Sequence, residues 1–119
     1  MNTKTHETYC SYNLTNLLTK LGFDWKDYFV AHDIDEHFHW EIPLHIAQKW
    51  LREVKNIDVV VSRAMQWKQF YYTITHEENR TSKIDFMSLN EDLWWFKYEE
   101  ALEAGIQKAL EIILEKGDM

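Results

Sequence analysis

The stretch YEEALEAGIQKALEIILEK, residues 98–116, decides the fold because one periodicity explains nearly every residue in it. Apolar residues recur at the i, i+3, i+4, i+7 spacing of one helix face, and acidic and other polar residues fill the opposite face. Acidic residues occupy the first turn, and Lys116 followed by Gly117 ends the stretch, as helix termini favour. Gly105 interrupts the apolar stripe at a cost of about 1 kcal/mol against alanine, so we expect the sheet to cross closely there.

Three strands are predicted upstream, at residues 57–65, 68–76 and 83–89, because these segments are rich in β-branched and aromatic residues and are separated by polar breaks. We expect the first hairpin to turn around Gln66 and Trp67 and the second around Asn79. This pairing aligns two apolar cross-strand rows. The rows are Val59 with Ile74 and Ile84, and Val61 with Tyr72 and Phe86.

The opposite face of this antiparallel meander is mixed in character. It is therefore expected to meet water or a partner, while the apolar face packs against helices. The residues assigned to this second face are Asp58, Val60, Ser62, Gln69, Tyr71, Thr73, Asp85 and Met87.

Two further helices are predicted before the strands. Asn13 is expected to cap a helix over residues 13–21 that Gly22 closes. Pro43 is suited to the first position of a second helix, which Asn56 ends. The apolar face of this second helix carries Ile46, Ala47, Trp50, Leu51 and Val54, and its solvent face carries His45, Lys49, Arg52 and Lys55.

The remaining segments are predicted to be irregular. Residues 1–8 are polar and expected to be flexible, and residues 28–31 are expected to form a short edge strand. Residues 32–41 and 90–97 are predicted loops. Together these elements predict one α+β domain over residues 1–119, with two layers and the order α-(β)-α-β-β-β-α.

Composition restricts the class of protein. The chain has 119 residues, a formal net charge of -7 and an aromatic content of 15%. The negative charge disfavours nucleic acid, since binding to a phosphate backbone needs clustered Lys and Arg. Cys10 is the single cysteine, and no apolar leader or segment of transmembrane length is visible, so we expect a cytoplasmic protein without a membrane partner.

Two resemblances add to this interpretation. The helix, three-strand meander and helix of residues 43–116 resemble the topology of a double-stranded-RNA-binding domain. That family contacts phosphates through lysines at the start of its last helix, where this chain has Tyr98, Glu99 and Glu100, so the function is not transferred. The blocks YCSYNLTNLLTKLGFDW, IPLHIAQKWLREVKNI and FKYEEALEAGIQKALEII look like those of a family of short uncharacterised proteins from bacteriophages and mobile elements of Bacteroidetes. This resemblance implies a small cytoplasmic protein of phage type.

No residues are assigned to catalysis. Cys10 lies near Ser11 and His6 but has no protease-type context, and the chain has no glycine-rich phosphate loop. No cofactor is predicted. His37 and His39 are weak candidates for a metal site, because H-x-H on a strand points both rings to one side. They belong to a histidine-rich and acidic group that also contains His32, Asp33, Asp35, Glu36 and His45.

Binding has two candidate surfaces. A basic and aromatic cluster could hold a small anionic, nucleotide-like ligand; its residues are Lys49, Arg52, Arg63, Trp67, Lys68 and Tyr71. An aromatic surface could instead serve a homo-oligomer or a host protein, since aromatic residues and Met are enriched at interfaces; its residues are Tyr71, Met87, Leu93, Trp94, Trp95 and Phe96. We expect a non-catalytic interaction module, with the ligand site as the alternative and metal binding third.

Overall fold

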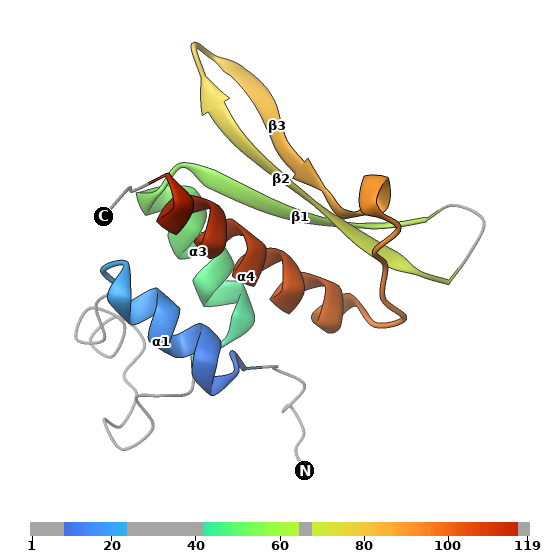
Figure 1. Ribbon diagram of the computed structural model, residues 1–119, viewed down its shortest axis with the longest axis horizontal. Coiled ribbons are helices and arrows are strands. Elements are labelled where there is room, and N and C mark those ends of the chain that lie inside the picture. The colour runs from blue at the N-terminus through green and yellow to red at the C-terminus, as the bar shows by residue number, and fades with distance from the viewer. Residues whose placement is uncertain (1–8, 24–41, 65–67, 117–119) are drawn as a thin grey trace.

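The computed structural model describes residues 9–23, 42–64 and 68–116. These residues form an α+β structure in which α1 (Tyr12–Lys20), α3 (Leu44–Val54) and α4 (Tyr98–Glu115) lie on one side of a three-stranded antiparallel sheet (Figure 1). The strands β1 (Ile57–Arg63), β2 (Phe70–Glu78) and β3 (Thr81–Met87) follow one another in space as in sequence. The expected α+β class and the helix–meander–helix order are confirmed.

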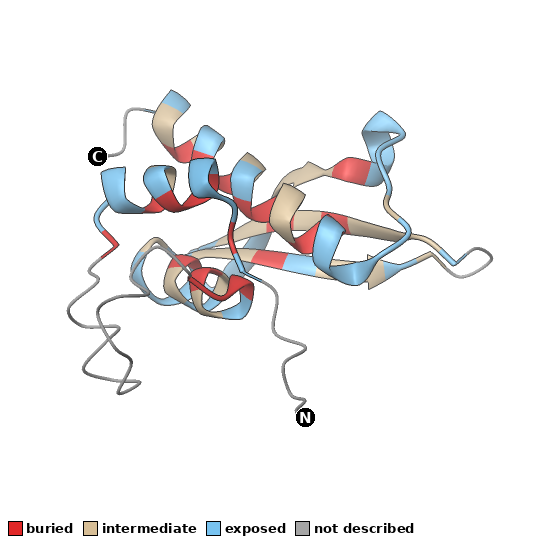
Figure 2. Cartoon of the chain, turned by 90° about the horizontal axis from the view of Figure 1, so that it is seen from below, coloured by how far each residue is buried: buried red, intermediate tan, exposed pale blue. Residues whose placement is uncertain are grey.

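The core lies between the sheet and the helices. α4 packs against β1 and β2, and α3 packs against β1. Buried stretches alternate with exposed ones along each helix, as Figure 2 shows. The largest fully buried side chains of this core include Leu14, Leu18, Leu51, Val59, Ile74, Ile106, Leu110 and Ile113.

Helix α4 matches its expected start at Tyr98, and its last helical residue is Glu115. Gly105 is buried at the predicted close crossing. A Cβ atom on Gly105 would lie 2.7 Å from Val59 Cγ1 and 2.9 Å from Tyr72 Cγ. The sheet therefore approaches the backbone of α4 more closely than any larger residue permits.

The expected starts of the other two helices need small corrections. α1 is capped by Ser11 and not by Asn13, because the Ser11 hydroxyl accepts a hydrogen bond from the Leu14 N–H at 3.2 Å. Gly22 closes this helix with a φ of 107°. Pro43 is the N-cap of α3 and precedes its first residue, Leu44.

The first hairpin has the predicted register, since Val59 faces Ile74 and Val61 faces Tyr72. The predicted register of the second hairpin, with Ile84 opposite Ile74 and Phe86 opposite Tyr72, is wrong. β2 and β3 are joined at Asn79 and Arg80, both with positive φ, so the turn has two residues and Ile84 faces Thr75. The pairing then shifts by one residue, and Phe86 faces Ile74.

This shift places the bulged residue Asp85 between the two registers of β3. The sequence pattern predicts Ile84 in the core row, but its partner Thr75 lies on the uncovered face and Ile84 is 62% exposed. The same pattern predicts Asp85 on the uncovered face, but its carboxylate contacts His76 on the helix side. A bulge has this effect because it adds one residue to one strand only.

The predicted edge strand at residues 28–31 and the loop at residues 32–41 lie outside the described residues, as do residues 1–8 and Gly117. The segment 90–97 is not entirely loop. It begins within a 3-10 turn, η2 (Ser88–Glu91), and Trp95 forms an antiparallel bridge with Phe70.

Candidate functional site

The sheet surface that faces away from the helices is the first candidate site (Figure 1). Strand pairing assigns its members, because residues directly opposite each other point to the same side of a sheet. Val60, Thr73 and Met87 form one row, and Asp58, Thr75 and Ile84 form another. We call this surface, together with Ser62, Tyr71, Trp94 and Phe96, the open face.

Trp94 and Phe96 join the open face because of the bridge at Trp95. The Phe70 N–H donates to the Trp95 carbonyl at 2.7 Å, and the Trp95 N–H donates to the Phe70 carbonyl at 2.8 Å. The Trp95 ring packs towards the core, 5.5 Å from the Tyr72 ring centroid. Since alternate side chains of an extended segment point to opposite sides, Trp94 and Phe96 point to the open side.

These two rings also contact each other, in an edge-to-face arrangement with their centroids 5.2 Å apart. Phe96 is 69% exposed, and Val60, Leu93 and Trp94 are also exposed. The structure thus brings Tyr71, Met87, Trp94 and Phe96 of the predicted interface set to one side of the sheet. It separates Trp95 from them, because that ring is partly buried and packs against the core.

Charge is nearly absent from the open face. Its acidic residue Asp58 lies at one end of β1 and forms an ion pair with Arg52, at 3.5 Å. Beyond it, Glu77 lies near the tip of the β2–β3 hairpin. The other residues of the open face have hydroxyl, aliphatic, aromatic or Met side chains. This neutral surface contrasts with the net charge of -7 of the whole chain.

The outer edges of the sheet are less available than its open face. Gln48 Nε2 of α3 donates to the Val59 carbonyl at 2.6 Å, so this acceptor of edge strand β1 is already used. Edge strand β3 carries the bulge and Lys83, two features that discourage the addition of another strand.

The described members of the predicted ligand cluster are spread over α3, β1 and the residues next to them. Lys49 and Arg52 are exposed on α3, and Arg52 reaches the start of β1 through Asp58. Arg63 is the last residue of β1, five positions beyond Asp58, which corresponds to about 16 Å of extended chain. Lys68 is exposed close to the β1–β2 connection, and Trp67 lies outside the described residues.

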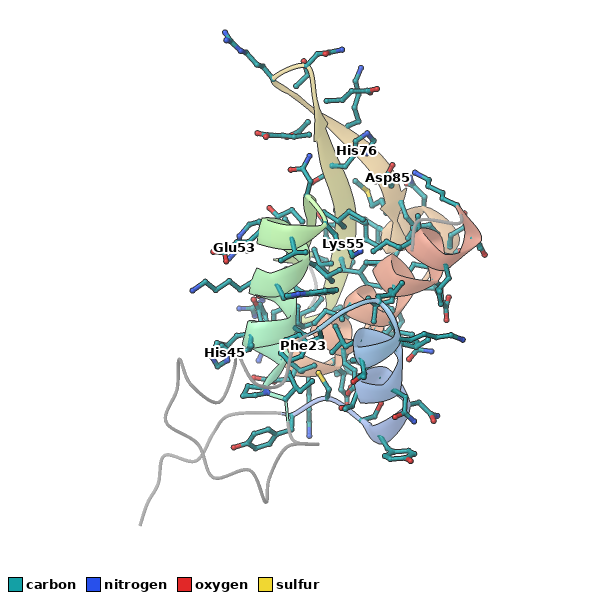
Figure 3. The ribbon with its side chains drawn as sticks, turned by 90° about the vertical axis from the view of Figure 1, so that its left-hand side faces the viewer. Phe23, His45, Glu53, Lys55, His76 and Asp85 are labelled. Carbon is teal, nitrogen blue, oxygen red and sulfur yellow. The ribbon has the colours of Figure 1, made fainter. Side chains whose placement is uncertain are left out.

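A second candidate site surrounds His76 and Asp85, a pair that the sequence did not indicate. Both Asp85 carboxylate oxygens lie 2.9–3.0 Å from His76 Nδ1, and Glu78 lies 3.8 Å from Nε2. Figure 3 shows both side chains on neighbouring strands. The sequence contains one indication of this pair, since Asp85 is an acidic residue within an apolar strand. The side of the sheet on which Asp85 lies depends on the bulge, which the sequence pattern does not predict.

Two pockets adjoin the His76 ring. One, of about 260 Å³, lies towards Arg52 and Ser82. The other, of about 190 Å³, lies between the ends of α3 and α4. His76, Asn56 and Ile57 contribute to both.

Cys10 has the properties of a buried core thiol. Burial, and to a smaller extent the charge of Glu103, raises the pKa of Cys10 to about 12. The thiol therefore stays protonated at neutral pH, which is unfavourable for a nucleophile.

The part of the chain that the structure describes was compared with the needs of a metal site and of a membrane-spanning helix. Within that part, no three His, Cys, Asp or Glu side chains come together as a metal-binding group, and no helix is long and apolar enough to cross a bilayer. His37 and His39 lie outside it, and His45 is exposed in the first turn of α3.

No protein-family model matches this chain, and comparisons with curated proteins and with solved structures give no significant match.

Proposed function

We propose that the protein is a non-catalytic interaction module that associates with a second copy of itself through the open face. The observation that carries this proposal is the uncovered, nearly uncharged sheet surface with exposed Val60, Ile84, Trp94 and Phe96. Aromatic residues and Met are enriched in the cores of protein interfaces, whereas charged residues are depleted there.

We infer that the partner is a second copy of the chain from the distribution of its negative charge. Two chains that each carry -7 repel one another, so they can approach most easily through a surface that carries little of that charge. The Trp94 and Phe96 rings supply large contact areas of the kind that dominates binding energy at interfaces. Association through the sheet edges is less favourable. Gln48 already uses the Val59 carbonyl of edge strand β1, and the bulge makes edge strand β3 irregular.

The test is sedimentation velocity over a concentration series, applied to the wild type and to Ile84→Lys and Phe96→Lys. We expect a reversible dimer whose dissociation constant rises at least about tenfold in either variant, because a lysine would be buried without a partner. Ile84 is 62% exposed in one chain, so the substitution should leave the folded monomer intact.

The matched control is Val54→Lys. Val54 is 60% exposed, but it is the last residue of α3, on the helix side of the sheet. This variant should dimerise as the wild type does. A wild type that stays monomeric across the series would contradict self-association and point to a different protein as the partner. A dimer that Val54→Lys weakens as much as Ile84→Lys would exclude the open face.

A further inference from the structure

Met87, the last residue of β3, lies on the open face. Its chain neighbour Phe86 packs against the core, and alternate side chains of a strand point to opposite sides of the sheet. Met87 faces Thr73 of β2, and Ile84 faces Thr75 two residues further along the same strand. Ile84 is therefore the exposed neighbour of Met87 towards the tip of the β2–β3 hairpin.

Two exposed aromatic rings, those of Trp94 and Phe96, flank Met87 on its other side. Phe70 pairs with β1 along one edge of β2, so its bridge to Trp95 lies along the edge that β3 occupies. The bridged segment therefore continues the line of β3 beyond the 3-10 turn η2. Met87 thus lies within the surface that carries the proposed interface, with exposed apolar side chains on both sides.

We propose that oxidation of Met87 to its sulfoxide by hydrogen peroxide dissociates the dimer. This inference rests on the proposed self-association and adds its regulation. In the reaction, one peroxide oxygen bonds to the thioether sulfur, the O–O bond breaks, and the other oxygen leaves with both protons as water. The sulfur loses two electrons, which the peroxide gains.

The sulfoxide turns an apolar side chain into a polar one without adding charge. A thioether can be buried against a partner without a hydrogen bond, whereas a buried S=O group that finds no donor costs free energy. A contact between two equivalent surfaces buries Met87 twice, so each dimer is affected at two places. Met87 is partly exposed in the single chain, which gives a molecule as small as hydrogen peroxide access to it.

The experiment is sedimentation velocity on the wild type before and after treatment with hydrogen peroxide. Tryptic peptide mass spectrometry follows the oxidation, because residues 84–97 form a peptide in which Met87 is the single methionine. Fragmentation of this peptide separates oxidation of Met87 from oxidation of its two tryptophans. We expect complete oxidation of Met87 to raise the dissociation constant at least about tenfold.

Reversal is the second arm of the experiment. Methionine sulfoxide reductases for both sulfoxide epimers convert the sulfoxide back to the thioether. They should therefore restore the dissociation constant of the untreated protein. An effect of tryptophan oxidation would persist, because these enzymes act on methionine sulfoxide.

Met87→Leu is the matched variant, since leucine has a similar volume but no sulfur. It retains Met1, Met65 and Met119, so any effect of oxidising those residues remains. It also retains the buried Cys10. Whatever the dissociation constant of this variant, peroxide should leave that constant unchanged.

The rate of Met87 oxidation supplies an independent readout. In the wild type it should fall as the protein concentration rises through the dissociation constant, because the partner copy covers the sulfur. In Ile84→Lys, which weakens the contact, it should stay at the rate of the monomer over the same concentrations.

Three results would overturn the proposal: a dissociation constant unchanged after complete oxidation of Met87, equal weakening of the wild type and Met87→Leu by peroxide, or no recovery with the reductases. In each of them the untreated protein still dimerises, so the regulation fails and self-association stands. An untreated wild type that is monomeric contradicts the proposed function, and this inference fails with it.

Discussion

Gly105 is the residue at which α4 and the sheet come closest. The helix loses about 1 kcal/mol of propensity by having glycine there. The lack of space for a side chain explains why glycine occupies this position, because a Cβ atom would lie 2.7 Å from Val59 Cγ1 and 3.1 Å from Tyr72 Cβ. Tyr72 is 3% exposed and stacks on Phe86, so its ring has little room to move.

Gly105→Ala is therefore expected to lower the free energy of unfolding by about 1–3 kcal/mol, because overpacking outweighs the gain in helix propensity. Urea denaturation measures this change. Gln107→Ala, at an exposed position on the same helix, should stay within about 0.5 kcal/mol of the wild type. Unchanged or increased stability in Gly105→Ala would show that the crossing is looser than this geometry requires.

The Cys10 thiol couples stability to alkaline pH. Its pKa rises from an ordinary 9.0 to about 12 in the folded chain, through burial first and Glu103 second. Between these values the folded chain keeps a proton that the unfolded chain has lost. The free energy of unfolding therefore falls as pH rises, by up to about 1.4 kcal/mol per pH unit.

We expect the wild type to lose about 1 kcal/mol more than Cys10→Ala between pH 8 and pH 10. Burial and the charge of Glu111 raise the pKa of Tyr72 from 10.0 to about 12, so the Tyr72 contribution begins near the upper end of that interval and is present in both proteins. Urea denaturation at the two pH values measures the difference. Parallel losses in the two proteins would show that the folded thiol titrates normally.

At the scale of elements, the start of α1 is held by Ser11 in two ways. Its hydroxyl caps the helix through the Leu14 N–H, and its own N–H donates to Glu103 Oε2 of α4 at 3.0 Å. The sequence favoured Asn13 as the cap, which is equally suited chemically. The contact with α4 favours Ser11 at the cap position, since it holds the Ser11 backbone in place.

Ser11→Ala should lower the free energy of unfolding by about 1 kcal/mol through loss of the cap. The Ser11 N–H bond to Glu103 is retained, because it belongs to the backbone. Asn13→Ala is the matched comparison and should change stability by less than about 0.5 kcal/mol, since Asn13 is exposed within the first turn. The opposite order of effects would assign the cap to Asn13.

For the whole molecule, net charge determines how self-association responds to salt. Chains that each carry -7 repel, while the open face contributes little charge of its own. Raising the ionic strength from about 0.01 M to about 0.15 M shortens the screening length from about 30 Å to about 8 Å. The dimer should therefore become tighter with added salt.

Sedimentation velocity at the two ionic strengths measures this response. An interface formed by complementary charges would weaken instead, because salt screens its attraction. A dimer that dissociates at the higher ionic strength would thus exclude the neutral open face as the contact.

The sequence by itself determined the elements and much of their packing. Hydrophobic periodicity located α4, the predicted strands overlapped all three observed ones, and alternation set the register between Val59 and Ile74. Gly105 signalled the close crossing of helix and sheet. These features were predictable because periodicity is a local property of the chain, and a hairpin register that buries one face has few alternatives.

Only the tertiary structure decided the candidate sites. The bulge at Asp85 moved Ile84 to the open face and brought the Asp85 carboxylate to His76. The bridge between Trp95 and Phe70 directs one ring of the aromatic run, that of Trp95, against the core. Such pairings join residues far apart in the sequence and depend on how the strands twist and end, so the local pattern does not specify them.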